Sequence, residues 1–146
     1  MSRLACGKGI AQFQALALAS DGGGVTAWER LTGGGGQVQA RAMSASGKSW
    51  GGLKQLTRSG VVLFGSGPSV AAADGRGFVA WTLRVNNKLS VGVTVLVGHH
   101  WSPAHTFPAL GSAVVSAADA PSSSRSVLGA LVWSTTEGLK LSAYSR

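Results

Sequence analysis

Three histidines form the densest group of side chains that could do chemistry in this sequence. His99, His100 and His105 lie close together in the chain, around Trp101. Imidazole is a common metal ligand, but a structural zinc site needs four ligands, and no cysteine or carboxylate lies beside these three. We therefore expect an exposed loop between strands here, and we predict neither a metal site nor a bound cofactor.

Carboxylates are too few and too scattered to favour acid–base catalysis. The 146 residues include five Asp and Glu against 13 Lys and Arg, which gives a net charge of +8. Glycoside hydrolysis requires two carboxyl groups that face each other across the substrate. Glu29 and Glu137 are far apart in the sequence, and the aspartates stand in predicted turns. The sequence therefore predicts no catalytic residues and does not favour an enzyme.

Composition excludes several other classes of protein. The basic residues are scattered singly, whereas nucleic-acid-binding proteins gather positive charge on one face or segment, so we expect no nucleic-acid partner. No apolar stretch is long enough to span a bilayer. Cys6 is the only cysteine, which excludes an intramolecular disulfide bond and leaves the cellular compartment open.

A strand with one buried face is indicated from Leu89 to Val97, where every second residue is apolar. Successive side chains of a strand point to opposite sides, so this period of two places all the apolar side chains on one face. A second apolar segment, Phe78–Val85, precedes it across the Asn86-Asn87 turn, and a third, Trp101–Phe107, follows it. The segment therefore predicts antiparallel strands joined by short turns.

The same pattern occurs three times along the chain. Trp28, Trp81 and Trp133 stand in similar apolar contexts, 53 and 52 residues apart, and a near-constant spacing of this size is typical of repeat architectures. An acidic turn residue precedes each of them: Asp21, Asp74 and Asp119. We expect each tryptophan to fill the same position in the core of its copy.

The strands that follow the tryptophans also align. Matching alternations begin at Val38, Leu89 and Leu139, which lie 10, 8 and 6 residues after the respective tryptophans. Because these offsets differ in steps of two, all three copies are expected to bury the same face.

Four short antiparallel strands per copy are the size of one propeller blade. We predict an all-β, propeller-like chain and one repeat domain over residues 1–146. Its blades are expected at 12–56, at 69–107 and, in part, at 113–146, where residues 1–10 could supply the missing strand. Propellers have at least four blades, so the ring is expected to close through self-association into a homo-oligomer or through further sequence.

A family resemblance supports this architecture. Gly47-Lys48-Ser49-Trp50 resembles the end of the Asp-box, Ser-x-Asp-x-Gly-x-Thr-Trp, although Ala45 stands where the Asp should be. The chain resembles the sialidase-like (BNR, or Asp-box) β-propellers of secreted actinobacterial proteins, which implies an extracellular location. In that family the box is a structural turn. Its enzymes use an arginine cluster, a Tyr–Glu nucleophile pair and an Asp acid/base, but nothing in this sequence brings Tyr144 and Glu137 together.

The resemblance also implies a ligand-binding end, formed by the loops between second and third strands. Candidate ligand-binding residues at or beside this end are Glu29, Arg30, Arg84, Asn86 and Asn87, with Trp101 as a side chain that could stack on a sugar. Ordinary hairpin chemistry is the alternative for the turn residues. We expect a non-catalytic, lectin-like module that recognises a glycan or cell-surface polymer. The alternatives are a protein-interaction or structural scaffold and a degenerate sialidase-like glycosidase.

Overall fold

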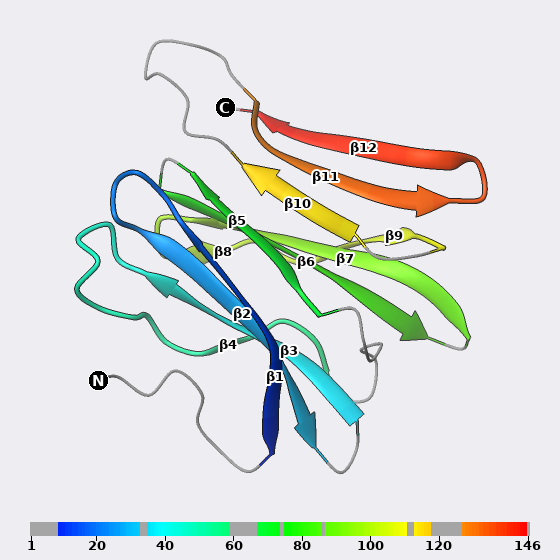
Figure 1. Cartoon of the computed structure of the whole chain (residues 1–146), viewed down its shortest axis with the longest axis horizontal. Coiled ribbons are helices and arrows are strands. Elements are labelled where there is room, and N and C mark those ends of the chain that lie inside the picture. Colours follow the sequence, from blue (N-terminus) through cyan, green and yellow to red (C-terminus); the bar gives the residue numbers. More distant parts are fainter. Residues whose placement is uncertain are drawn as a thin grey trace.

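Three antiparallel sheets follow one another along the chain (Figure 1). The computed structural model describes residues 9–32, 35–58, 67–73, 75–85, 87–110, 113–117 and 127–145. Sheet 1 contains β1 (Ile10–Leu18), β2 (Gly24–Thr32), β3 (Gly35–Met43) and β4 (Lys54–Gln55). Sheet 2 contains β5 (Ser69–Ala73), β6 (Arg76–Val85), β7 (Lys88–Val97), β8 (His100–Trp101) and β9 (His105–Pro108). Sheet 3 contains β10 (Ala113–Ala117), β11 (Val127–Thr135) and β12 (Gly138–Ser145).

The prediction of an all-β chain of antiparallel strands is confirmed. The strands pair in chain order, as a meander, except that β8 and β9 both pair with β7 in sheet 2. The outermost strands are shorter than expected: Trp50 forms a bridge to Met43, and only β4 follows it. The predicted strand Trp101–Phe107 is divided into β8 and β9, because Pro103 lies between them and has no N–H to donate to β7. A helix that could cross a membrane is absent from the part of the chain that the structure describes.

Tight turns with left-handed glycines join the third strands to the fourth. Gly47 has φ +67° and Gly98 has φ +57°, and each stands three residues before a tryptophan. In the first of these turns the Ser49 N–H donates to the Ser44 hydroxyl, and the Gly47 N–H donates to the Ser44 carbonyl. Ser44 therefore helps to close this turn, in which Ala45 replaces the Asp of the Asp-box.

The repeated tryptophans lie on the second strand of each sheet, and all three are buried. Trp81 belongs to the core between sheets 1 and 2, and Trp133 belongs to the core between sheets 2 and 3. Each of these two indoles therefore faces the preceding sheet, as expected for one packing position used repeatedly. Trp28 follows Ala27 on β2, and neighbouring side chains of a strand point to opposite faces. Ala27 packs against sheet 2, so the Trp28 indole lies on the face of sheet 1 that points away from sheet 2.

Glycines four residues before Trp81 and Trp133 allow the sheets to approach closely. A Cβ added to Gly77 would lie 3.1 Å from Val25, and one added to Gly129 would lie 2.8 Å from Phe78. Val25 and Phe78 are themselves equivalent positions, three residues before their tryptophans. The same contact is thus made at both junctions between sheets.

The first strands of the three sheets lie together, with β5 in contact with both β1 and β10. Figure 1 shows sheets 1 and 3 on opposite sides of sheet 2. Sheets 1 and 2 also keep a common direction, because the β1–β2 and β5–β6 turns line one pocket at the same end. This arrangement leaves room for side-chain pockets at the two junctions.

Candidate functional site

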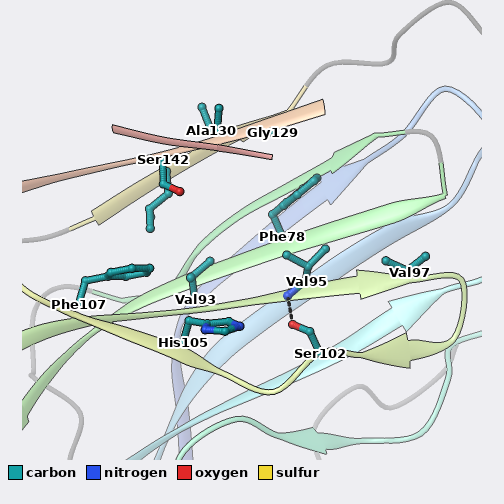
Figure 2. A pocket seen from close by; sticks show the side chains of 12 residues that line it. Phe78, Val93, Val95, Val97, Ser102, His105, Phe107, Gly129, Ala130 and Ser142 are labelled. Carbon is teal, nitrogen blue, oxygen red and sulfur yellow. Dashed lines mark hydrogen bonds between the residues drawn. The ribbon is translucent and has the colours of Figure 1, made fainter. Parts of the chain in front are cut away.

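A pocket of about 280 Å³ opens between sheets 2 and 3 (Figure 2). This volume is close to the lower limit for sites that hold small ligands. Its lining comes from β6, β7, β9, β11 and β12, together with Ser102 in the loop between β8 and β9. The lining residues are Phe78, Val93, Val95, Val97, Ser102, His105, Phe107, Gly129, Ala130, Leu131, Ser142 and Ala143.

Unequal side-chain sizes on the two sheets create the pocket. Sheet 2 contributes large side chains such as Phe78 and Phe107, whereas sheet 3 contributes Gly129 and Ser142. In Figure 2 Ser142 points toward sheet 2, while Ala130 points away from it. The close Phe78–Gly129 contact sets the distance between the sheets, and the small residue at position 142 leaves the space beside it unfilled.

An aromatic contact forms one boundary of this region. The rings of Phe107 and Trp133 lie with centroids 5.1 Å apart and an interplanar angle of 32°. The Trp133 indole N–H donates to the Pro108 carbonyl at 3.1 Å. Phe107 is therefore fixed on one side by sheet 3, and its half-buried ring also borders the pocket.

Ser102 places a hydroxyl group at the edge of the pocket. Its oxygen accepts the Val95 N–H at 2.9 Å and lies 3.3 Å from the Thr94 hydroxyl oxygen. The Thr94 hydroxyl hydrogen is committed to the Ser102 carbonyl at 2.8 Å. The Ser102 hydroxyl hydrogen is therefore the one left to donate, either to Thr94 or to a ligand in the pocket.

His105 supplies another polar side chain to the lining. It is exposed on β9, opposite Val93, and shares a face of the strand with Phe107. A neutral imidazole both donates and accepts hydrogen bonds. No hydrogen bond joins His105 to Ser102 among the described residues, and the lining includes no carboxylate. The described lining therefore offers apolar surface and hydrogen-bonding groups, and it contains no pairing of a nucleophile with a base of the kind that covalent catalysis uses.

A second pocket of about 190 Å³ lies at the junction of sheets 1 and 2. It is built largely from turns, and its lining includes Asp21, Arg76 and His99. The Asp21 carboxylate accepts the Gly23 N–H at 2.7 Å, which is the turn role expected for this residue. The two other repeat aspartates, Asp74 and Asp119, lie outside the described residues.

The predicted ligand-binding residues are divided between different parts of the molecule. Arg84 and Asn87 are exposed beside the β6–β7 turn, while Asn86 lies outside the described residues. Trp101 is half-buried at the opposite end of sheet 2, where it pairs with Leu96 and packs against the core between sheets 1 and 2. As ligand contacts, Arg84, Asn87 and Trp101 stay predictions.

The two remaining candidates lie on β2, and one of them is inside the protein. Glu29 is fully buried, because β2 turns this residue to the same side as Val25 and Ala27, against sheet 2. Its carboxylate accepts a hydrogen bond from the Gln12 amide at 3.3 Å. Arg30 is half-buried on the opposite face of the strand. The Glu29 carboxylate is therefore not exposed at the predicted ligand-binding end, which the loops between second and third strands were expected to form.

The other groups singled out for chemistry stay apart. Glu137 lies in the β11–β12 turn and forms an exposed ion pair with Lys140 at 2.6 Å. The side chain of Tyr144 is outside the described part of the structure. His99 and His100 are exposed near the β7–β8 turn, and the described residues contain no group of His, Cys, Asp and Glu side chains that could hold a metal ion.

Sequence reasoning missed the contributions of Ser102, Phe107 and Ser142 to the pocket. Their types carry no signal by themselves, since the pocket depends on which residues of sheet 3 face the aromatic residues of sheet 2.

Neither the known protein families nor the curated proteins contain a match to this chain.

Proposed function

We propose that this chain is a non-catalytic binding module that takes one ring of a glycan into the pocket between sheets 2 and 3. The observation that carries the proposal is the pocket itself. It combines aromatic walls from Phe78 and Phe107 with polar side chains, among them Ser102 and His105.

The chemistry of a sugar ring matches this combination. A pyranose presents a C–H face that packs against aromatic side chains, and its hydroxyl groups need hydrogen-bonding partners at the edges of the site. Phe107 offers such a surface, while Ser102 and His105 offer a donor and an acceptor. The net charge of +8 favours acidic glycans over neutral ones, because it raises their local concentration around the protein.

The proposed architecture is an incomplete β-propeller. Meanders that pack face to face, with their first strands together, are the arrangement that propeller blades adopt. The sequence resemblance to sialidase-like propellers points the same way. In this proposal sheets 1, 2 and 3 are successive blades, and the pocket is a seam between two of them.

A glycan array tests the function. We expect fluorescently labelled protein to bind a subset of acidic glycans. Ser142→Trp fills the pocket and should reduce binding at least tenfold. His105→Ala should weaken it several-fold, since it removes one hydrogen-bonding partner.

Thr106→Ala is the matched control, because Thr106 is the exposed neighbour of His105 on β9 and points to the other face of the strand. This variant should bind as the wild type does. Binding that Ser142→Trp leaves unchanged would place the ligand elsewhere. Wild-type protein that binds no glycan on the array would refute the proposal.

A further inference from the structure

The face of sheet 3 that points away from sheet 2 exposes large apolar side chains. Leu139 is 78% exposed and Leu141 is 67% exposed, and Val132 lies beside them on β11. We call this the outer face of sheet 3. Its six described positions carry no charge: Ala130, Val132, Ser134, Leu139, Leu141 and Ala143.

The equivalent faces of the other two sheets are covered. Strand pairing defines the equivalence: Val38, Val91 and Leu139 each lie opposite the residue that follows the repeated tryptophan. Val38 and Val91 are fully buried, because the next sheet packs on them. Leu139 occupies the same position in sheet 3, where no described residue of the chain packs on it. The outer face of sheet 3 therefore has the pattern of a surface onto which another sheet packs.

The opposite end of the stack carries a matching surface. On β1, Leu16 and Leu18 are 58% and 60% exposed on the side of sheet 1 that faces away from sheet 2. Leu16 and Leu18 pair with the residues two and four positions before Trp28. Val70 and Ala72 on β5 pair with the residues two and four positions before Trp81, so they are the equivalents in sheet 2. Val70 and Ala72 pack against sheet 1, in the junction that Trp81 fills.

We infer that the outer face of sheet 3 packs against the far face of sheet 1 in a second copy of this chain. We define the far face of sheet 1 by the exposed side chains of Leu16 and Leu18 on β1. This contact would repeat the packing seen between sheets 1 and 2 and between sheets 2 and 3. At each of those junctions the face that carries Val38 or Val91 packs against the next sheet in the chain. In the inferred contact, the face that carries Leu139 packs against sheet 1 of the second copy.

The inferred contact is head-to-tail, since it joins two different surfaces, and such contacts form closed rings when the rotation between copies allows it. Two copies of three sheets each would supply six, a number within the range of known propellers. The inference does not depend on glycan binding.

The mass of the protein in solution tests this contact. By light scattering and native mass spectrometry we expect the wild type to be a dimer. Leu141→Glu or Leu16→Glu should weaken association at least tenfold, because each places a charge in an apolar contact. Both side chains are exposed within one chain, so the fold should tolerate the change, and circular dichroism checks it. Leu53→Glu changes another exposed leucine, beside β4 at the edge of sheet 1 opposite β1, and should leave the dimer intact.

Mixing the two variants distinguishes a head-to-tail contact from a symmetric one. In the mixture, the intact outer face of the Leu16→Glu chain can meet the intact far face of the Leu141→Glu chain. A heterodimer should therefore form although neither variant pairs with itself. A monomeric wild type, a dimer that survives both substitutions, or a mixture of folded variants that stays monomeric would overturn the inference.

Discussion

Gly92 offers the sharpest test of how the tryptophans pack. It pairs with Trp81 across β6 and β7. A Cβ added at this position would lie 2.4 Å from Cε2, 2.5 Å from Nε1 and 2.7 Å from Cζ2 of the Trp81 indole. These atoms belong to a rigid ring that is buried between sheets 1 and 2, so the ring cannot swing aside. We therefore predict that Gly92→Ala destabilises the protein.

Two opposing effects set the magnitude of this change. Alanine is favoured over glycine in a strand by about 0.5–1 kcal/mol, because glycine loses more backbone entropy on folding. Overpacking a buried site typically costs about 1–3 kcal/mol, and the close approach to three ring atoms places this site in the upper part of that range. We expect a net loss of about 1–2 kcal/mol in the free energy of unfolding. At about 3 °C per kcal/mol for a chain of this length, Tm should fall by roughly 3–6 °C.

Urea and thermal unfolding, followed by circular dichroism, measure this loss. Gly52→Ala is the control, because a Cβ there meets no atom within 4 Å. It should leave stability unchanged or raise it by less than about 1 kcal/mol. The same Gly92→Ala change in a Trp81→Phe background should cost at least about 1 kcal/mol less, since phenylalanine lacks part of the opposing ring. A Gly92→Ala protein as stable as the wild type would refute the packing described for Trp81.

Two further substitutions test the turns and the junction between sheets 2 and 3. Trp133→Phe removes the hydrogen bond to the Pro108 carbonyl and part of the contact with Phe107, and urea unfolding should show a loss of about 1–3 kcal/mol. Gly47→Ala forces a side chain into a left-handed turn at φ +67° and should cost about 1 kcal/mol, whereas Gly51→Ala should cost less than half of that, because its φ is not positive. Equal stabilities for Trp133→Phe and wild type, or for the two glycine variants, would contradict these assignments.

Local patterns were sufficient to predict the strands. The alternation from Leu89 to Val97 corresponds to β7. The even offsets between copies place Val38, Val91 and Leu139 on equivalent faces, but the prediction that all three faces are buried is wrong for the third copy, where Leu139 is 78% exposed because no described residue packs on it. The position along the strand was less accurate. Val38 pairs with the residue after Trp28, and Val91 pairs with the residue after Trp81, so Val91 and not Leu89 is the equivalent of Val38. Alternation in the sequence fixes which face of a strand is apolar, but it does not fix the register of the strand in its hairpin.

The pocket could not be predicted in the same way. It depends on Gly129 and Ser142 lying opposite Phe78 and Phe107, and these residues meet through packing between sheets rather than through spacing in the sequence. Glu29 shows the converse case. Its charge suggests an exposed position, but the packing of sheet 1 on sheet 2 buries its side of β2.

The most direct test of the binding site is a titration of ¹⁵N-labelled protein with the best glycan from the array, followed by amide chemical shifts. We predict the largest shifts at Val95, His105, Phe107 and Leu131, around the pocket between sheets 2 and 3. Shifts confined to the β6–β7 turn, around Arg84 and Asn87, would contradict this prediction and would place the ligand at the end of the sheets.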